Sequence, residues 1–350
     1  MNTLNYIGSK KTLCPTIIDI ISREIGGDDI LNTKSFIDMF AGTGSVGFRV
    51  QGIVSKVIAN DLEYYSFVIN NALLKCNYSL KLKGIIDDCQ TMLGVEGLVF
   101  QNYSTNSLCN RMFFSNENAR RCDSIRQHIE QLKVNDAITL EEYYFILASL
   151  LVAVDKVANT SCVYGAYLKQ YKASAMKNFV LIPIHSRTDL NTEKNSVYNV
   201  RAEELCVSSA DIAYIDPPYN QRQYSANYCP LNYIAKYDPS IILTGKTGLI
   251  ENYNKSDFCS KVKVKVAFKH LLDNTHCQYI FISYNNEGLV KCDELIELLS
   301  TYGALKLYKI PYKKFKAQIS VDGDTVYEYL WFIDKSLPTS FSEIHATMIS

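Results

Sequence analysis

The first eighty residues alternate between apolar patterns of helical spacing and short, continuously apolar runs. Apolar side chains recur at helical spacing over residues 12–25 and again over 63–76, which predicts two helices. The runs SFIDMF (35–40) and KVIAND (56–61) predict buried strands, and a glycine-rich turn leads from the first strand into a further helix. Because parallel strands are joined by crossover helices, this order predicts an α/β fold with a parallel sheet.

Strand patterns fade between about residues 77 and 201. Residues 116–133 and 140–160 carry helical patterns. The second pattern begins with Thr139 and Glu142, whose spacing is typical of a capping box at a helix start. A mainly helical segment is therefore expected to interrupt the sheet-forming chain.

Strand patterns return in the second half of the chain, with a helical pattern at 260–274. The returning apolar runs occupy residues 211–216, 278–285, 304–313 and 327–335. We therefore expect an α/β core split in sequence into 1–80 and 200–335. A helical insertion at 81–199 separates its two parts, and a second segment without strand pattern lies at 222–258.

Composition narrows the class of protein only slightly. Hydrophobic residues make up 47% of the 350 residues and charged residues 21%, which excludes a disordered chain. The 36 basic residues balance the 36 acidic ones, so net charge indicates no partner. A zero sum can still hide a basic cleft, and nucleic-acid binding stays open.

Several simple features point to a cytoplasmic protein that acts without a metal ion. The eleven cysteines form no C-x-x-C pair, and the first residues lack the apolar core of a signal peptide. The longest apolar run, 145–154, is too short to cross a membrane. The five histidines are dispersed, without the spacing of metal ligands.

A glycine-rich turn follows the first predicted strand. Gly42, Gly44 and Gly47 fit the G-x-G-x-x-G pattern, in which backbone N–H groups approach a nucleotide without Cβ interference. Asp61 ends the next strand, where an acidic side chain accepts hydrogen bonds from ribose hydroxyls. A nicotinamide enzyme also fits this pattern, and so does a tight turn without a ligand. Asp38, four residues before the turn, favours a ligand with an ammonium group, such as S-adenosylmethionine.

The stretch Asp216-Pro217-Pro218-Tyr219 follows the apolar run 212–215 directly. In a doubly wound sheet, ligands bind beyond the carboxyl ends of the strands, so this stretch is expected beside the glycine turn. A carboxylate and a proline carbonyl can accept the two hydrogens of an exocyclic amino group and turn its lone pair toward a methyl donor. The tyrosine ring offers a face on which an extruded base can stack. The alternative is a Pro-Pro turn with a surface tyrosine.

Together these motifs resemble the Dam-like alpha group of adenine-N6 DNA methyltransferases, particularly the modification enzymes of type II restriction systems. The resemblance rests on NYIGSK, DMFAGTGSVG, AND and DPPY in that order, with VDKVANTSCVYGAYLKQ, RQYSANY and ISYNNEG between or after them. It implies a doubly wound, Rossmann-like methyltransferase core with a helical target-recognition insertion. It also implies S-adenosylmethionine as cofactor and transfer of its methyl group to N6 of a flipped adenine in double-stranded DNA.

The resemblance also implies roles for individual residues. Asp216 to Tyr219 would handle the target adenine. The residues expected around the cofactor are Tyr6, Lys10, Asp38, Phe40, Gly42, Gly44, Asp61 and Asp216. In the family an acidic residue usually contacts the adenine of the cofactor. The chain departs from this pattern, because Arg201 stands at the aligned position and Glu203 lies nearby.

Four residues are expected to bind DNA: Arg222, Gln223, Tyr224 and Lys169. For the arginines of the helix predicted at 116–133, a solvated charged face is the alternative to DNA contact. Other possibilities for the whole chain are a methyltransferase acting on RNA adenine or a protein glutamine, a nicotinamide-dependent oxidoreductase, and a non-catalytic DNA-binding module. The expected partners are double-stranded DNA and a cognate restriction endonuclease, with the enzyme a monomer.

Overall fold

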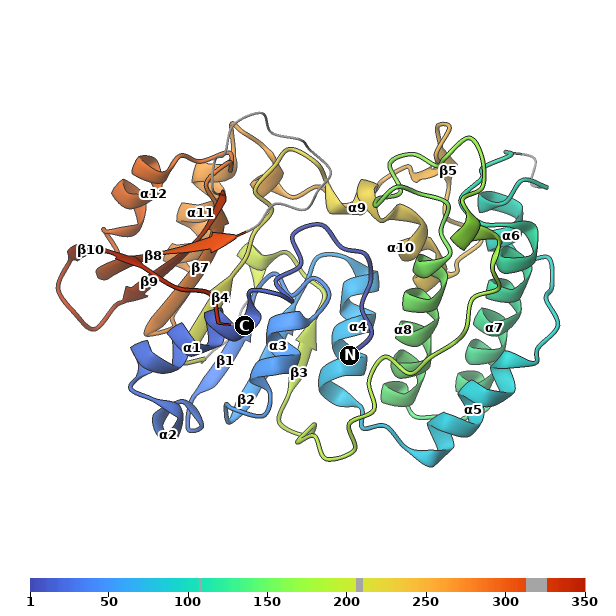
Figure 1. The fold of residues 1–350 in the computed structure, drawn as a ribbon, viewed down its shortest axis with the longest axis horizontal. Helices are drawn as coiled ribbons and strands as arrows, with labels where there is room; N and C mark the ends of the chain where they lie inside the picture. The colour runs from blue at the N-terminus through green and yellow to red at the C-terminus, as the bar shows by residue number, and fades with distance from the viewer. Residues whose placement is uncertain (107–108, 206–209, 313–325, 350) are drawn as a thin grey trace.

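A twisted, mostly parallel sheet forms the centre of the molecule (Figure 1). The computed structural model describes residues 1–106, 109–205, 210–312 and 326–349. Within them the sheet runs in the order β10-β8-β9-β7-β4-β1-β2-β3, and only β9 is antiparallel to its neighbours. The strands are β1 (Ser35–Asp38), β2 (Lys56–Asn60), β3 (Ser196–Tyr198), β4 (Ile212–Ile215), β7 (Tyr279–Asn285), β8 (Ala304–Tyr312), β9 (Val326–Asp334) and β10 (Ser340–His345).

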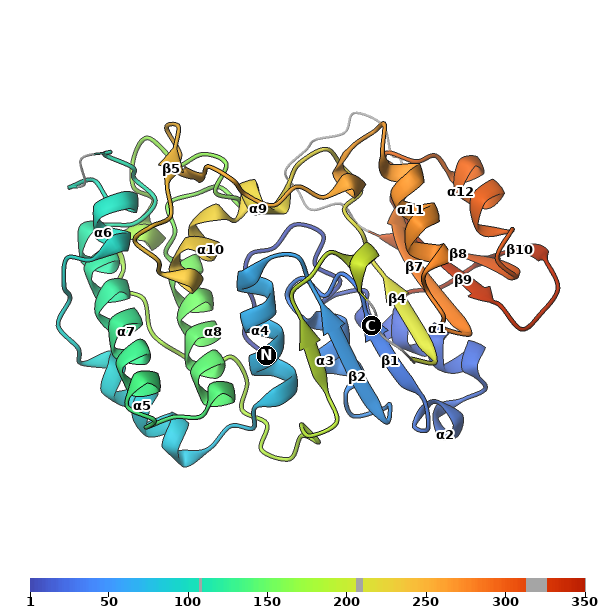
Figure 2. The same cartoon turned by 180° about the vertical axis from the view of Figure 1, so that it is seen from behind.

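Helices cover both faces of the sheet, as expected for a doubly wound fold. Successive residues of β1 face opposite sides: Phe36 joins one apolar core and Ile37 the other. The first core is covered by α1 (Cys14–Ile25), α3 (Ser45–Val50) and α4 (Tyr64–Lys75). The second is covered by α11 (Val264–Asp273) and α12 (Cys292–Leu299), on the face seen in Figure 2. The short helix α2 (Asp28–Leu31) follows α1.

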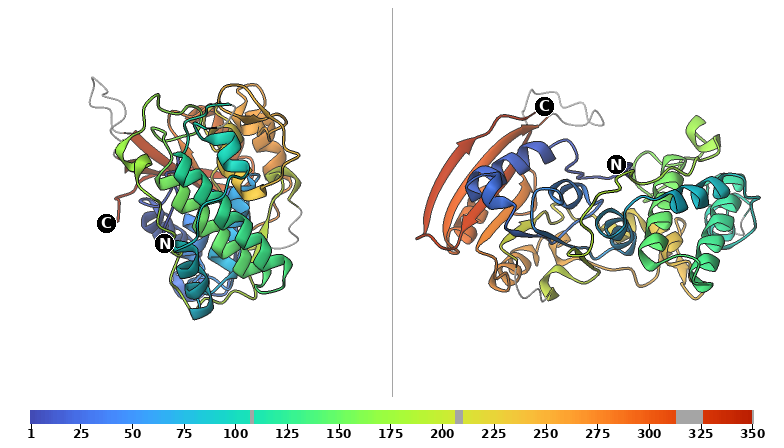
Figure 3. Two further views of the ribbon diagram at one scale, coloured as in Figure 1. Left: turned by 90° about the vertical axis from the view of Figure 1, so that its right-hand side faces the viewer. Right: turned by 90° about the horizontal axis from the view of Figure 1, so that it is seen from below.

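A group of helices lies beside the sheet, next to α4 (Figures 1 and 3). It comprises α5 (Leu80–Gln90), α6 (Leu98–Tyr103), α7 (Asn116–Val134), α8 (Leu140–Lys156), α9 (Tyr224–Asn227) and α10 (Cys229–Lys236). The nearly all-apolar α8 is buried between α4 and α7. Its predicted capping box is confirmed, because the Thr139 hydroxyl accepts from the Glu142 N–H and the Glu142 carboxylate accepts from the Thr139 N–H.

Loops, short 3-10 helices and a small hairpin complete the chain. The hairpin consists of β5 (Leu243–Thr244) and β6 (Leu249–Ile250), which pair with each other and not with the main sheet. The 3-10 helices are η1 (Ala173–Met176), η2 (Ala202–Glu204) and η3 (Asp257–Cys259). Among the described residues, no helix has both the length and the apolar character required to cross a membrane.

Two edge strands correct the expected boundaries of the core. β3 lies inside the stretch 81–199 that was expected to be insertion, and it pairs with β2. β10 lies beyond residue 335 and pairs with β8. β3 is half-buried and β10 is largely exposed, so neither sequence has the apolar run by which buried strands are found.

Candidate active site

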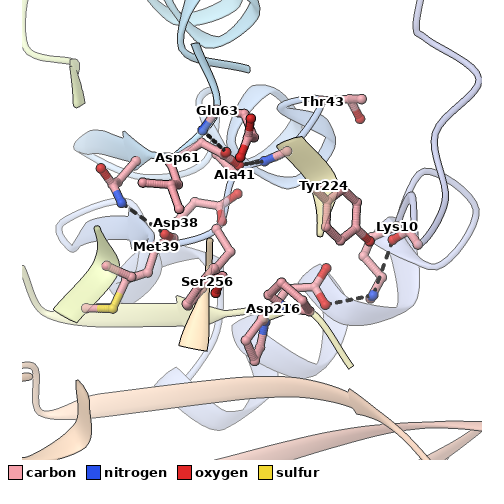
Figure 4. A pocket seen from close by; sticks show the side chains of 18 of the residues that line it. Lys10, Asp38, Met39, Ala41, Thr43, Asp61, Glu63, Asp216, Tyr224 and Ser256 are labelled. Carbon is pink, nitrogen blue, oxygen red and sulfur yellow. Dashed lines mark hydrogen bonds and ion pairs between the residues drawn. The ribbon is translucent and has the colours of Figure 1, made fainter. Parts of the chain in front are cut away.

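One deep cavity opens at the carboxyl ends of β1, β2 and β4 and encloses about 930 Å³, its open mouth included. It lies where the strand order reverses between β1 and β4, the position at which doubly wound folds bind ligands. Residues 2–10, the N-terminal strap, cover one side of it (Figure 4). Most residues expected around cofactor and target base line this cavity: Tyr6, Lys10, Asp38, Phe40, Gly42, Asp61, Asp216, Pro217, Pro218 and Tyr219.

The glycine turn is fixed by contacts on both sides. Gly42 has a φ of 50°, and a Cβ there would come within 3.1 Å of the Tyr6 ring. Its N–H donates to Asp61 Oδ2 at 2.7 Å, and its carbonyl accepts from Ser66 and Asn70. Only a glycine allows both this backbone conformation and the close approach of the ring.

Gly44 packs closely against α4. A Cβ at this position would lie 2.6 Å from Leu73 and 2.8 Å from Asn70 of α4. Its φ of 72° and its place directly before α3 also require glycine. The second glycine of the motif therefore allows the turn before α3 to pack against α4, and its expected contact with the cofactor stays a prediction.

Asp38 presents an unsatisfied carboxylate to the cavity. The side chain is buried at the end of β1, and the backbone N–H groups of Phe40 and Gly47 donate to it. Among the described residues, its Oδ1 has no hydrogen-bond partner. Burial, followed by the charges of Asp216 and Asp61, raises the pKa of Asp38 well above its usual range. A cationic ligand group would satisfy this oxygen, so the site fits the ammonium of S-adenosylmethionine.

Asp61 and Glu63 form the wall at the end of β2. The two Asp61 oxygens accept from the backbone N–H groups of Gly42 and Glu63, which fixes the carboxylate where a ribose would lie. No local motif singles out Glu63, yet it is buried and lines the cavity. Its carboxylate accepts from Ser225 and from Asn232 Nδ2, and burial raises its pKa to about 7.

The Asp-Pro-Pro-Tyr stretch leaves β4 and borders the cavity opposite Asp38 (Figure 4). Lys10 of the strap donates to Asp216 Oδ1 at 2.8 Å. Burial raises the pKa of Asp216, the Lys10 charge lowers it, and the nearby Glu328 carboxylate raises it again. The Tyr219 carbonyl accepts from the Leu289 N–H, which anchors the end of the stretch to the loop after β7.

Tyrosine rings form the wall between the strap and α9. The Tyr6 ring stacks on Tyr228 with a centroid distance of 4.8 Å and lies 5.3 Å from Tyr224. The Tyr224 hydroxyl donates to the Ile7 carbonyl at 3.1 Å. The strap is therefore held over the cavity by aromatic contacts and hydrogen bonds to its backbone.

Of the four residues expected to bind DNA, two lie in the cavity wall and two are exposed to solvent. Tyr224 lines the cavity beside Tyr6, and the Gln223 side chain exchanges two hydrogen bonds with the Ser256 backbone. Arg222 and Lys169 have exposed side chains. Of the four, these two present their charges to solvent, whereas Tyr224 and Gln223 hold the cavity wall together.

Two of the three arginines of α7 neither face solvent nor are free to contact DNA, the two interpretations that the sequence left open. Arg121 donates to the Phe179 carbonyl at 2.6 Å, and the buried Arg126 donates to the carbonyls of residues 234 and 235. These two arginines join α7 to neighbouring segments. Arg120 does lie on the solvated face, paired with Glu96.

The two residues found where an acidic contact to the adenine of the cofactor was expected, Arg201 and Glu203, both line the cavity. The Arg201 guanidinium donates to the Lys255 carbonyl at 2.9 Å and lies 3.4 Å from Glu203 Oε1. The charge of Arg201 is therefore partly compensated, and the Glu203 carboxylate is the acidic group at this side of the cavity.

The arrangement can hold a cationic, nucleoside-like cofactor between Asp38 and Asp61 and present an exocyclic amine to Asp216. A doubly wound sheet with this chemistry at its switch point defines an S-adenosylmethionine-dependent methyltransferase.

Comparison with known proteins identifies the family. The model of the D12 class N6 adenine-specific DNA methyltransferases matches residues 6–298. The chain is 41% identical to the type II methyltransferase M.NlaIII of Neisseria lactamica, over 95% of this chain and 100% of that protein. It is 44% identical to M.CviAII of Paramecium bursaria Chlorella virus 1, over 95% and 99%. M.FokI of Planomicrobium okeanokoites is 34% identical, and the chain spans 53% of it.

This chain belongs to the D12 class N6 adenine-specific DNA methyltransferase family and uses S-adenosylmethionine. The resemblance found in the motifs is confirmed. The alternatives of an RNA or protein methyltransferase, an oxidoreductase and a non-catalytic DNA-binding module are set aside by the same match.

Proposed function

We propose that the enzyme methylates one adenine of a short, specific sequence in double-stranded DNA after the base has rotated out of the helix. The supporting observation is that Asp38 and Asp216 reach the same cavity from neighbouring strands. The strap and Tyr224 border this cavity, and the side chain of Asp216 is only 17% exposed. A base inside a duplex could not reach Asp216, so extrusion of the adenine is required.

Bound S-adenosylmethionine supplies a methyl group on a sulfonium. The Asp216 carboxylate and the Pro217 carbonyl accept the two amino hydrogens of adenine and direct the nitrogen lone pair toward the methyl carbon. The amino nitrogen would become acidic as it is methylated, and the Asp216 carboxylate would accept the proton it loses and pass it to water. Tyr219 supports the base by stacking, and Asp38 and Asp61 hold the methionine ammonium and the ribose.

The DNA surface is proposed to combine the helical insertion with the segment 222–258. Exposed Lys169 and Arg222 would contact phosphates. The β5-β6 hairpin belongs to the same segment as Arg222 and packs against α10. These parts together would recognise the target sequence.

By its relatives, the enzyme is proposed to be the modification methylase of a type II restriction system. A cognate restriction endonuclease would share its recognition sequence. We propose that it acts as a monomer in the cytoplasm, because one cavity can modify one strand at a time.

The test is transfer of a labelled methyl group from S-adenosylmethionine to unmethylated bacterial DNA, followed by nucleoside analysis and single-molecule sequencing. N6-methyladenine in one short sequence is the expected result. Label spread over unrelated sequences would contradict site specificity. Base extrusion is tested separately with 2-aminopurine at the target position, whose fluorescence should rise on binding; unchanged fluorescence would contradict extrusion.

A further inference from the structure

Glu328 is a buried carboxylate near the start of β9, beside the end of β7. It lies on β9, paired with Asn285 of β7 and Ile310 of β8, and is 5% exposed. Its Oε1 accepts from Ser283 Oγ at 2.5 Å and lies 3.2 Å from Lys10 Nζ. A buried carboxylate is costly unless it is paired, so its partners indicate its purpose.

The partner of interest is Lys10, which also contacts the catalytic stretch. Its ammonium has acceptors at Asp216 Oδ1 (2.8 Å), Glu328 Oε1 (3.2 Å) and the Gly8 carbonyl (3.4 Å). Three acceptors match the three N–H bonds of an ammonium. Lys10 is therefore fixed in direction and position, although its stem comes from the strap and not from the sheet.

The carboxylates around Lys10 also affect its protonation. Burial lowers the pKa of Lys10, but the charges of Asp216 and Glu328 outweigh it and raise that pKa well above its usual range. One protonated lysine therefore lies between two carboxylates, which leaves one surplus negative charge. Since Lys10 binds Oδ1 of Asp216, the other carboxylate oxygen is left to accept the amino hydrogen.

We propose that Glu328 is a positioning residue for methyl transfer: with Ser283 it holds Lys10 against Asp216, and so fixes the orientation and charge of the catalytic carboxylate. Glu328 does not line the cavity, so it acts through Lys10 and not on the cofactor or the base. The proposal rests on the proposed role of Asp216.

Two substitutions of Glu328 separate its effect on the position of Lys10 from the effect of its charge. Glu328→Ala removes an acceptor of Lys10, and kcat should fall by about 10-fold to 100-fold because the carboxylate is no longer held in place. Glu328→Gln keeps an oxygen acceptor but removes the charge, so the loss of kcat should be smaller. Equilibrium binding of S-adenosylmethionine, measured by calorimetry, should change much less than kcat in both variants.

The pH profile provides the signature that a merely structural role would not produce. Activity requires ionised Asp216, and removal of the Glu328 charge lowers the pKa of Asp216. The acid limb of kcat in Glu328→Gln should therefore move to lower pH. The other titratable side chains that interact electrostatically with Asp216 are all present in this variant: Lys10, Asp38, Tyr214 and Tyr224.

The matched control is Glu343→Gln, which removes a carboxylate paired with Lys309 at 2.7 Å on the same sheet, away from the cavity. It should leave kcat and the acid limb unchanged. If both Glu328 variants fold and keep the wild-type kcat and pH profile while Asp216→Ala is inactive, the positioning role is refuted and the proposed function stands. If Asp216→Ala is itself active, the proposed function fails first.

Discussion

Asp38, which is proposed to bind the cofactor, opposes the stability of its own fold. Its Oδ1 is buried without a partner among the described residues, and its pKa is raised mainly by burial. An acid whose pKa rises on folding destabilises the native state wherever it is ionised in the unfolded chain. The penalty is absent in acid and grows as pH rises above the ordinary range of aspartate.

Asp38→Asn should therefore change stability and cofactor binding in opposite directions. At neutral pH the melting temperature of the free enzyme should rise, because the variant buries no charge. Its dissociation constant for S-adenosylmethionine should increase by about 10-fold to 100-fold, the worth of a charge-assisted hydrogen bond. Calorimetry measures both quantities, with exposed Asp19→Asn as control. Unchanged cofactor affinity would contradict the assignment of Asp38.

Tyr219 should matter for its ring and not for its hydroxyl. Tyr219→Phe keeps the stacking face and should retain most of the kcat, whereas Tyr219→Ala should lose it by one to two orders of magnitude. Steady-state kinetics on a duplex that contains the target sequence compares them. An equal loss of kcat in both variants would show that the hydroxyl, and not the ring, is the part of Tyr219 needed for methyl transfer.

At the scale of elements, the β5-β6 hairpin depends on a residue far from it in sequence. Arg111 is 5% exposed and donates to the carbonyls of Asn102, Gly245 and Lys246 at 3.1 to 3.3 Å. The Tyr103 hydroxyl donates to the Gly248 carbonyl at 2.7 Å. The turn of the hairpin, residues 245–248, is thus held by side chains from the helical insertion.

Arg111→Ala should release the hairpin and cost about 2–4 kcal/mol of unfolding free energy, because three carbonyls lose a charged donor. DNA affinity should fall while affinity for S-adenosylmethionine stays the same. Arg120→Ala, which removes an exposed arginine paired with Glu96, is the control and should change neither. Wild-type DNA affinity in a folded Arg111→Ala variant would argue against DNA contact by the hairpin.

Glu63 ties the start of α4 to α9 and α10 and should make stability depend on pH. Burial raises its pKa to about 7, so the folded state holds a proton that the unfolded chain releases near pH 4.5. This contribution is complete below about pH 4.5 and is lost as pH rises through about 7. Glu63→Gln should remove this dependence, as measured by urea unfolding between about pH 5 and pH 8. An equally steep dependence in Glu63→Gln would assign it to another group.

The elements that could be predicted from sequence are those with an apolar run or an apolar pattern of helical spacing. β1, β2, β4 and β7 have such runs, and α8 has an apolar pattern with its capping box at Thr139. β3 and β10 were missed because neither edge strand has such a run. The arginines of α7 were misread because whether a charged side chain faces solvent or a carbonyl depends on which segments pack against its helix.

At the scale of the whole molecule, the residues of the site that depend on distant segments could not be predicted from local sequence either. Asp38, Gly42, Asp61 and Asp216 follow strand ends, so local sequence identifies them. Glu63 and Glu328 acquire their roles from partners distant in sequence, at Ser225 and Lys10 respectively, and no local pattern contains that information. The placement of the strap beside the cofactor site was expected only from the family resemblance. From its residues alone, a short polar segment would be assigned to solvent.

The strap also determines when the enzyme can become active during its synthesis. Asn5 donates to Asp155, the Ile7 N–H to Tyr228, and Lys10 pairs with Asp216 and Glu328. The strap is therefore held by residues that are synthesised long after it, the last of them Glu328. A nascent chain that already contains the glycine turn and the Asp-Pro-Pro-Tyr stretch still lacks one anchor of its lysine until β9 has been made.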